Sequence, residues 1–478
     1  MTSSVPPAAQ WTQPSGAVGA PDGDLIRVLT GYLPRQRWFA ATGESLQPVL
    51  RARRPVAERD GVGVEQVIVQ ADTAGAAADE GNLYQLWIAW SAALPERLGP
   101  ALIGQAGDLL GYDALADHSF TDHLLSLIAD GTELGELSFS PEPDASIDRT
   151  ASGLPLTGEQ SNTSIVYGHS AILKVFRRLA PGPNPDLEVH RALHALGSSQ
   201  VAAPLGEIRG PVAGQSTTLA LLTSFFAGGA DGWAMATNSV RDLMAEGDLR
   251  ADEVGGDFAA EAYRLGQVVA GVHADLATAF GTAVPDAQAA GELRQHWVET
   301  ATRTAEQVPA LAPLLPAILD VFASAGAAIA AEPAQRIHGD LHLGQTLRVV
   351  AGWVVIDFEG EPDKPVTYRR SRHSPLRDIA GMLRSFDYAA HHWITGGLGS
   401  SQQQYRAAEW AQRNGSAFCD GYAAASGQDP RERGELLAAF ELEKAVYEVG
   451  YEHGYRPAWE PIPLQAVSRL TSNERLRR

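Results

Sequence analysis

Three side chains in the C-terminal half have the types and spacing that phosphoryl transfer requires. The stretch HGDLHLGQ places Asp340 five residues before Gln345, and Asp357 follows twelve residues later, after an apolar segment in IDFEGEP. Phosphoryl transfer needs an acceptor hydroxyl held in line, a group that takes its proton, and metal ions that bridge the phosphates. Asp340 can take the proton, and the oxygens of Gln345 and Asp357 are ligands that Mg²⁺ prefers. Together the motifs predict a phosphotransferase site, although either motif alone also fits a chance match or a helix cap.

Two histidines flank Asp340, and they are open to a different interpretation. His338 and His342 stand four residues apart, a spacing that places two metal ligands on one helix face. Gly339 and Gly344 argue against a helix here, and no third nitrogen ligand is evident. We therefore expect His338 to fix the backbone of the loop and His342 either to do the same or to contact substrate.

Lys174 is one of only three lysines in a chain with 34 arginines, and it stands in the strand-like segment AILKVF. A half-buried ammonium needs a partner, and in kinases such a lysine holds the ATP phosphates beside a carboxylate from the next helix. Glu188, in that helix, is the expected carboxylate. The alternative is an edge-strand lysine that reaches the solvent.

The segments around this strand predict the remainder of a nucleotide site. EQSNTSIV occupies the place of a phosphate-covering loop, in which hydroxyl side chains and backbone N–H groups take the role of glycines. We expect Ser161, Asn162 and Thr163 to contact phosphate. The segment LLTSFFAGG resembles an interlobe hinge, where Thr223 and Phe225 would meet adenine.

The order of predicted elements indicates an α+β, bilobal, protein-kinase-like fold. Helices are expected at Asp24–Leu33, Leu102–Ala129 and Asp186–Leu196, and the chain after Asp231 is mainly helical apart from a strand-and-loop island at Arg336–Glu361. Strands are expected between these helices, among them Leu83–Trp90. The predicted domains are a disordered tail (1–22), an N-terminal cap (23–95), an intermediate subdomain with the nucleotide-binding sheet (96–226) and a helical C-lobe with the catalytic loop and acceptor site (227–478).

Composition excludes several classes of function. The net charge of −20 opposes nucleic-acid binding, which needs a basic face. No secretory signal and no membrane-spanning run of about twenty apolar residues is apparent. A single cysteine, Cys419, rules out an intrachain disulfide, so we expect a cytoplasmic protein.

The motifs also resemble a known family. HGDLHLGQ, IDFEGEP, SPLRDIAGMLRSFDYAA, EQSNTSIV and LEKAVYEVGYE are similar to the maltokinases of actinobacteria, which are relatives of the aminoglycoside phosphotransferases, and the similarity covers essentially the whole chain after the tail. The resemblance implies transfer of phosphate from ATP, with Mg²⁺, to maltose, giving maltose 1-phosphate for α-glucan synthesis from trehalose. It assigns Asp340 as the base, Gln345 and Asp357 as metal ligands, and Lys174 with Glu188 as the phosphate-ordering pair.

The acceptor stays open between maltose and glucosamine, because actinobacterial glucosamine kinases share this scaffold. Candidate acceptor contacts, which are aromatic rings that stack on sugars and polar groups that bind hydroxyls, are His342, Glu409, Trp410, Glu443, Tyr447 and Glu448. Arg377 and Asp378 are expected to form a salt bridge that holds the loop. An antibiotic phosphotransferase and a pseudokinase are further alternatives. We expect a monomer without nucleic-acid or membrane partners, which would work beside a trehalose-pathway enzyme.

Overall fold

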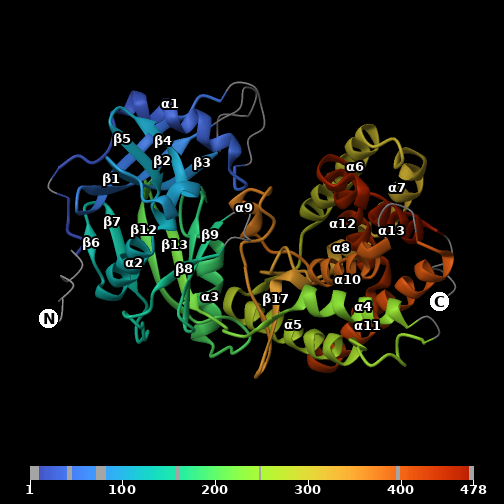
Figure 1. Ribbon diagram of the computed structural model, residues 1–478. Helices are drawn as coiled ribbons and strands as arrows, with labels where there is room; N and C mark the ends of the chain where they lie inside the picture. Colours follow the sequence, from blue (N-terminus) through green and yellow to red (C-terminus); the bar gives the residue numbers. More distant parts are fainter. Residues whose placement is uncertain are drawn as a thin grey trace. The chain divides into compact units, whose positions relative to one another are not determined.

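The protein is described here by a computed structural model in which residues 10–14, 16–39, 46–71, 82–156, 162–246, 249–394 and 399–472 are described. The chain forms two compact units, Met1–Leu187 with Ala203–Ala227, and Glu188–Ala202 with Gly228–Arg478. The first unit is built on two sheets and the second is mostly helical (Figure 1). The predicted α+β class is confirmed.

The first sheet of the first unit has both faces covered, and its sequence shows why. In β2 (Val62–Gln70), Val67 and Val69 pack with α1 (Asp22–Tyr32), whereas Ile68 packs on the other side with α2 (His118–Asp130). The consecutive apolar residues Val67, Ile68 and Val69 are typical of a strand buried on two faces. The strand order is β1–β2–β3–β5–β4, with β11 paired to β3; the other bounds are β1 Val49–Arg59, β3 Leu83–Ser91, β4 Leu102–Ala106, β5 Leu109–Asp113 and β11 Arg178–Leu179.

The predicted helix Leu102–Ala129 is wrong over its first half. Residues there form the hairpin β4–β5, and α2 begins only at His118. Gly107 has φ +59°, a left-handed conformation that closes the turn and that glycine adopts at no steric cost. The spacing of apolar residues alone did not reveal this turn.

Part of the segment predicted to be a disordered tail is folded onto the first unit. The indole Nε1 of Trp11 donates a hydrogen bond to the carbonyl of Ser119 at 2.9 Å, and its ring meets Phe120 at 5.6 Å. Thr12 pairs with Glu58 beside β1. Burial of one large aromatic ring offsets the ordering of this polar segment.

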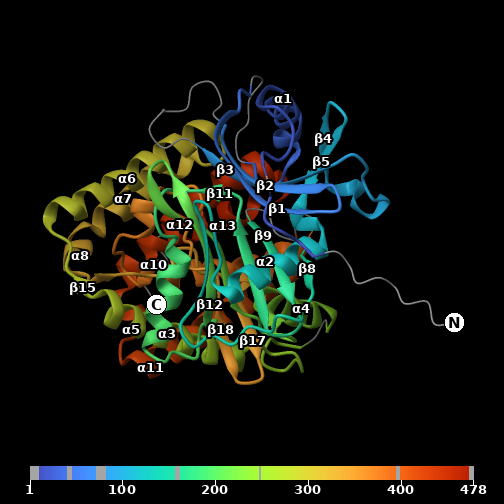
Figure 2. The same cartoon turned by 90° about the vertical axis from the view of Figure 1, so that its left-hand side faces the viewer.

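The second sheet carries the predicted nucleotide-binding strands. Its order is β6–β7–β12–β13–β10–β9–β8, and the strands run side by side in Figures 1 and 2. Helix α3 (Pro185–Ala195) follows, and the side chain of Asn184 caps it by accepting the N–H of Asp186 at 2.7 Å. The strand bounds are β6 Glu133–Leu134, β7 Leu137–Pro141, β8 Gly153–Pro155, β9 Asn162–Tyr167, β10 Ala171–Phe176, β12 Pro204–Val212 and β13 Gln215–Ser224.

The second unit packs its helices around one apolar core, which includes Trp297, Phe386 and Trp410. The helices are α4 Gly232–Ala245, α5 Ala259–Phe280, α6 Ala287–Gln307, α7 Leu315–Ser324, α8 Gly326–Ala331, α9 Val366–Arg369, α10 Leu376–His391, α11 Ser401–Ser426, α12 Gly434–Tyr455 and α13 Pro461–Thr471. Two small sheets join them: β14 (Ala230–Asp231) with β17 (Thr346–Val349) and β18 (Gly352–Val355), and β15 (Thr282–Ala283) with β16 (Ala334–Gln335).

One described segment, Ala312–Ala331, has the length and mean hydropathy (1.9) of a membrane span. It is not one continuous helix, because a 3₁₀ turn, α7 and α8 share it, and it contains Asp320. Ile318 and Phe322 from this segment are buried in the core of the second unit. Length and composition alone make the segment a weak candidate for a membrane span, and 22% of its apolar window is buried.

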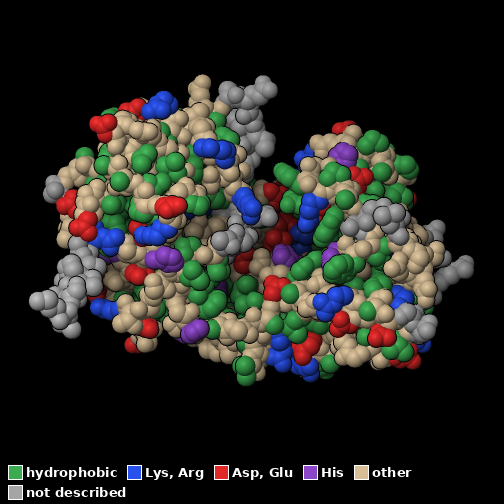
Figure 3. Space-filling view, viewed as in Figure 1, with side chains coloured by type: hydrophobic (Ala, Val, Ile, Leu, Met, Phe, Trp, Pro, Cys, Tyr) green, Lys and Arg blue, Asp and Glu red, His purple; other side chains and the backbone are tan. Residues whose placement is uncertain are grey.

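The surface drawn in Figure 3 carries acidic, basic and apolar side chains interspersed with one another. No broad basic area is visible on the described residues of that face.

Candidate active site

Asp378, at the start of α10, fixes the backbone of the predicted catalytic loop. Its Oδ2 accepts the N–H of His338 at 2.7 Å, and its Oδ1 accepts the N–H of Gly339 at 2.9 Å. His273 adds a bond from Nε2 to Oδ2 at 3.0 Å. Burial alone would raise the pKa of Asp378, but the hydrogen bond and charge of His273 and the other donors lower it below its ordinary value. An ionised carboxylate therefore holds the loop.

His338 links this loop to the strand that leads to Asp357. Its Nδ1 accepts the N–H of Asp340 at 3.3 Å, so Nε2 carries the proton and donates to the carbonyl of Ile356 at 2.9 Å. The expected structural role of His338 is confirmed. His342 also accepts a backbone N–H, that of Gly344 at 3.1 Å, and burial lowers its pKa.

Helix α10 runs very close to the loop, and Gly381 makes this possible. A Cβ at this position would lie 2.6 Å from the carbonyl oxygen of Leu341, which no side chain can tolerate without a shift. One turn further along α10, the hydroxyl of Ser385 accepts the N–H of Leu343 at 3.0 Å. The loop is thus held at several points by one rigid helix.

The carboxylate of Asp340 is not alone, because the ammonium of Lys444 on α12 lies beside it. Lys444 Nζ donates to Asp340 Oδ1 at 3.2 Å and to Glu361 Oε1 at 2.7 Å. Arg377 donates to the other oxygen of Glu361 at 2.7 Å and to the hydroxyl of Tyr368 at 2.6 Å. The salt bridge expected between Arg377 and Asp378 is therefore wrong. Arg377 pairs with Glu361, whereas Asp378 binds the backbone of the loop.

The charges of this cluster are set by its own partners. Burial alone would raise the pKa of Glu361, but the charges of Lys444 and Arg377 lower it well below its ordinary value. Burial alone would lower the pKa of Lys444, but Glu361 and Asp340 raise it well above its ordinary value. The cluster thus keeps a cation beside the carboxylate of Asp340.

The two predicted metal ligands, Gln345 and Asp357, lie together. Gln345 Nε2 donates to Asp357 Oδ2 at 3.0 Å, and the N–H of Ile356 donates to the carbonyl of Gln345 at 3.0 Å. Asp357 has φ +68°, a sparsely populated conformation for a residue with a side chain. Such strain persists only where the surrounding structure enforces it, which is common at functional sites.

The side-chain oxygens of Gln345 and Asp357 are suitable ligands for magnesium. The described residues contain no cluster of three or more His, Cys, Asp or Glu side chains arranged to hold a metal. Mg²⁺ does not require one, because it is usually held by one or two carboxylates, water and the phosphates of the substrate. One carboxylate (Asp357) and one amide carbonyl (Gln345) meet that requirement.

In the first unit, Lys174 has a carboxylate partner, though a different one from that expected. Its Nζ lies 3.3 Å from Oδ2 of Asp186, at the start of α3, and both side chains are largely buried, at 16% and 4% exposed. Glu188, two residues later, is instead bound by Arg336 at 3.0 Å and Arg370 at 2.9 Å. The helix was predicted correctly. Its first turn carries both Asp186 and Glu188, and the sequence alone did not show which of the two pairs with Lys174.

The strand register shows which neighbours share the sheet face of Lys174. Lys174 stands opposite Ser164 on β9 and opposite Leu221 on β13. Directly opposed residues point to the same face, and alternate residues return to it. Asn162 and Thr223 therefore share the face of Lys174.

Two of the predicted nucleotide contacts have other partners. The hydroxyl of Thr163, on the opposite face of the sheet, accepts a bond from Arg177 Nε at 2.8 Å. The N–H of Phe225 donates to the carbonyl of Ser170 at 2.9 Å, so it is not available to an adenine ring. Ser161 lies outside the described residues.

Comparison with known proteins shows what this arrangement is similar to. Residues 32–117 match the model of the maltokinase N-terminal cap domain. A glucosamine kinase from Streptacidiphilus jiangxiensis is 28% identical over 67% of this chain and 76% of its own length. One from Mycolicibacterium smegmatis is 32% identical over 49% of this chain and 59% of its own length. The chain is thus similar to sugar and aminosugar kinases.

The fold of these kinases is confirmed by a solved structure. A glucosamine kinase in complex with glucosamine, ADP and inorganic phosphate matches 95% of this chain and all of its own, with a TM-score of 0.65 and 21% identity. The chain thus has a kinase-like fold with a segment that matches the maltokinase cap, and this fold agrees with the one predicted from the sequence.

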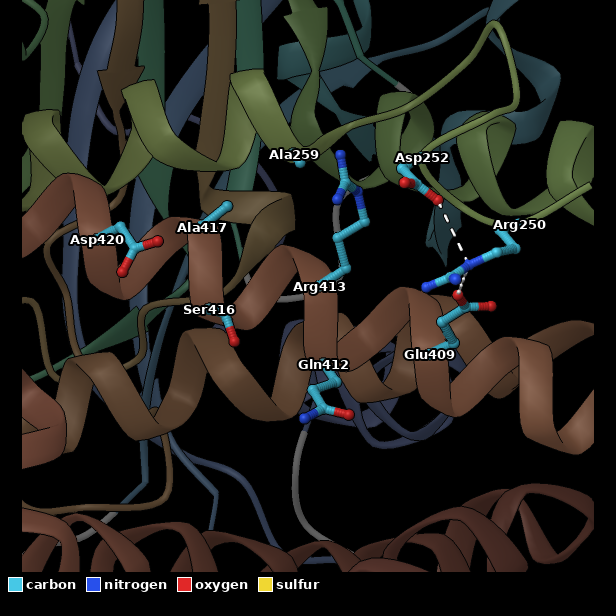
Figure 4. A pocket seen from close by; sticks show the side chains of 9 residues that line it. All are labelled: Arg250, Asp252, Ala259, Glu409, Gln412, Arg413, Ser416, Ala417 and Asp420. Atoms are coloured by element: carbon cyan, nitrogen blue, oxygen red, sulfur yellow. Dashed lines mark ion pairs between the residues drawn. The ribbon is translucent and has the colours of Figure 1, made fainter. Parts of the chain in front are cut away.

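Two residues predicted as acceptor contacts have other surroundings. Trp410 is 1% exposed, its Nε1 donates to Ser239 at 3.0 Å, and its ring packs on Phe258, so it cannot stack on a sugar. Glu409 lines a separate hollow of about 400 Å³ beside α11, where it pairs with Arg250 at 3.4 Å (Figure 4). Helical spacing identified α11 but not its buried side.

The other predicted acceptor residues gather on α12 around Lys444. The Lys444 ammonium lies 5.3 Å from the ring centre of Tyr447. Glu448 is bound by Arg384 at 2.8 Å. Glu443 has no hydrogen-bonding partner within the described part of the chain, and burial raises its pKa.

The sequence reasoning missed three residues that contact predicted site residues or one another: Lys444, Glu361 and Asp186. The signal for Lys444 was present, because the rarity of lysine that singled out Lys174 applies equally to it. Glu361 is the second glutamate of the IDFEGEP motif itself, but no recognisable spacing links it to a lysine 83 residues away.

Proposed function

We propose that the protein is an ATP- and Mg²⁺-dependent sugar kinase that converts maltose to maltose 1-phosphate. The observation that supports it best is the carboxylate of Asp340, presented on a loop that Asp378 holds at two backbone N–H groups. The neighbouring pair of Gln345 and Asp357 supplies oxygen ligands for a metal.

In the proposed reaction, the acceptor hydroxyl of the sugar attacks the γ-phosphorus of ATP. The new oxygen–phosphorus bond forms as the bond to the β-phosphate oxygen breaks, so ADP leaves. Asp340 orients the hydroxyl and takes its proton. Lys444 occupies Oδ1 of Asp340, which leaves Oδ2 for the hydroxyl.

The negative charges of ATP need cationic partners. In the second unit, Gln345 and Asp357 would hold magnesium, which when bound would supply positive charge to the phosphates. In the first unit, Lys174, held by Asp186, is the proposed contact of phosphate oxygens. Asn162 and Thr223, which share the sheet face of Lys174, are the proposed neighbours of the nucleotide.

The identity of the sugar that accepts the phosphate rests on separate observations. The maltokinase cap match favours maltose, and the two glucosamine kinase relatives favour glucosamine as the second candidate. On α12, Glu443, Tyr447 and Lys444 are the proposed contacts of the sugar, with the neutral ring of His342 as a further donor. Maltose remains the leading candidate because cations already hold the carboxylates of Glu361 and Glu448.

We also propose a cytoplasmic monomer that works beside a trehalose-pathway enzyme. The single cysteine, Cys419, is buried and free, which is compatible with a reducing compartment. Gel filtration at several concentrations would test the monomer directly.

The test of function is ADP release from Mg·ATP with maltose, glucosamine, glucose, trehalose and kanamycin, with Asp340→Asn as the blank. A signal with maltose that the blank lacks is the expected result. A signal with glucosamine alone would keep the phosphotransfer assignments and change the acceptor. No signal with any of the five compounds would refute the proposed activity.

A further inference from the structure

Lys444 places a fixed positive charge beside Asp340, the proposed base for the acceptor hydroxyl. Its ammonium contacts Asp340 at 3.2 Å and Glu361 at 2.7 Å, and only 21% of its side chain is exposed. Arg377, itself 9% exposed, holds the other end of Glu361 at 2.7 Å. Three linked ion pairs therefore keep the ammonium in one place.

The carboxylates around Asp340 have little attraction left for another cation. Glu361 is bound by two cations, Lys444 and Arg377. Glu448 is bound by Arg384 at 2.8 Å, and burial raises its pKa. A positively charged ligand that entered here would be repelled by Lys444. Among the carboxylates Glu361, Glu448 and Glu443, only Glu443 has no hydrogen-bonding partner in the described part of the chain.

Catalysis forces the acceptor close to this ammonium. The attacking hydroxyl must lie within about 3 Å of the Asp340 carboxylate. Since Lys444 Nζ is 3.2 Å from Oδ1 of Asp340 and the hydroxyl binds the neighbouring Oδ2, the hydroxyl and Nζ are within about 8 Å of each other. In a 2-amino sugar the ammonium is on the same ring as the hydroxyl, so the two cations would repel each other in a partly buried site.

We propose that Lys444 makes the acceptor site selective for neutral sugars over protonated amino sugars, an inference that rests on the proposed sugar kinase activity. A neutral hydroxyl can accept a hydrogen bond from the ammonium, whereas a sugar ammonium cannot. Lysine suits this role better than arginine, because its compact charge fits between two carboxylates. In a chain with 34 arginines and three lysines, lysine at this position is notable.

Glu443 is the group that could oppose this selectivity. It precedes Lys444 on α12 and has no hydrogen-bonding partner among residues that the structure describes. Burial raises its pKa and the nearby Arg377 lowers it, with a further rise from Glu361. A sugar ammonium bound there would favour its ionised form, so Glu443→Gln is the matched control for Lys444.

Glucose and glucosamine form a matched pair of probes, since they differ only in a hydroxyl or an ammonium at one carbon. We expect the wild-type enzyme to have a kcat/KM for glucose at least about tenfold above that for glucosamine, equivalent to about 1.4 kcal/mol. If neither is turned over, the same ratio is read from their inhibition of maltose phosphorylation. Raising the pH until the sugar amine loses its proton should shrink the ratio.

Variants then test whether Lys444 sets the ratio of kcat/KM for glucose to kcat/KM for glucosamine. Lys444→Gln removes the charge and is expected to bring the glucose-to-glucosamine ratio close to one, whatever it does to kcat. Lys444→Arg keeps the charge and the ratio. Glu443→Gln leaves the ratio high or raises it. Thermal melting verifies that each variant is folded.

Two results would overturn the inference. One is a wild-type preference for glucosamine that Glu443→Gln abolishes, and the other is an unchanged ratio in folded Lys444→Gln. Both leave the sugar kinase activity standing. Failure of the wild type to phosphorylate maltose, glucose or glucosamine would instead refute the proposed function itself, so the two failures are distinguishable.

Discussion

The side-chain amide of Gln345 donates a hydrogen bond to Oδ2 of Asp357 across 3.0 Å. The short antiparallel pair β17–β18 lies between the two residues in sequence and returns the chain to the loop. Asp357 adopts its left-handed backbone immediately after this pair. The hairpin and the strained residue together bring the two oxygen donors to one place.

Asp357→Asn should remove most of the activity while the protein stays folded. Asparagine is among the residues that tolerate a positive φ, so the backbone is not strained further. The lost charge should lower kcat/KM by about a hundredfold or more, because the metal loses its only proposed carboxylate ligand. Activity measured against Mg²⁺ concentration checks this.

Gln345→Ala is the matched comparison, since it removes a neutral ligand. Its effect should be smaller, with a weaker apparent Mg²⁺ affinity that excess metal partly restores. A normal Mg²⁺ titration curve for Asp357→Asn would show that this carboxylate does not hold the metal.

The sequence predicted well which residues around Asp340 lie close together, whereas their catalytic roles stay predictions. Asp340, Gln345 and Asp357 belong to two short motifs, and the chain between them is too short to place them far apart. Lys174 was found because a lone lysine in an apolar strand is unusual. A single sequence is most informative about short motifs and about residues whose type is unusual for their surroundings.

Contacts over long sequence separations could not be predicted in the same way. Lys444 and Asp340 are 104 residues apart, and only the packing of α12 beside the loop brings them together. Trp410 was assigned to the sugar because an aromatic ring on a helix fits either a core or a binding surface. Which side of α11 is buried depends on α5 and α10, and the sequence alone does not orient these helices.

Asp378→Asn should destabilise the loop and the fold. An amide offers one carbonyl oxygen where the carboxylate accepts N–H groups with both oxygens, so one buried donor loses its partner. We expect a loss of about 1–3 kcal/mol in the free energy of unfolding, measured by urea denaturation at pH 7. A lower kcat should accompany it because Asp340 is less well held.

The same variant should change the pH dependence of stability. The pKa of Asp378 is lowered on folding, so the carboxylate stabilises the native state above its unfolded pKa of about 3.9 and this contribution is lost as the pH falls. The free energy of unfolding should therefore decline less steeply below about pH 4 in Asp378→Asn than in the wild type. Parallel curves would contradict the assigned ionisation.

Lys174→Met should act on the nucleotide and not on the sugar. The methionine keeps the apolar stem on β10 and removes the ammonium that faces Asp186. We expect the KM for ATP to rise by about tenfold or more and kcat to fall, while the KM for the sugar changes little. A change confined to the sugar KM would be incompatible with a phosphate-contacting role.

Trp410→Ala should affect stability rather than acceptor binding. The ring is 1% exposed within the core of the second unit, and its loss leaves a cavity and the unpaired hydroxyl of Ser239. The expected cost is about 3–5 kcal/mol in the free energy of unfolding. Trp410→Phe should recover much of it, and the sugar KM of that variant should match the wild type. A large rise in sugar KM would restore Trp410 as an acceptor contact.

The central claim is that Asp340 transfers the proton in phosphorylation of a sugar, and one measurement tests it directly. Wild type and Asp340→Asn are each incubated with Mg·ATP and maltose, and the products are followed by ³¹P NMR, with ADP binding measured separately by calorimetry. The account predicts a maltose 1-phosphate signal from the wild type and a loss of about a thousandfold or more in its rate for Asp340→Asn, with ADP affinity unchanged. Formation of the sugar phosphate at a near-normal rate by Asp340→Asn would contradict it.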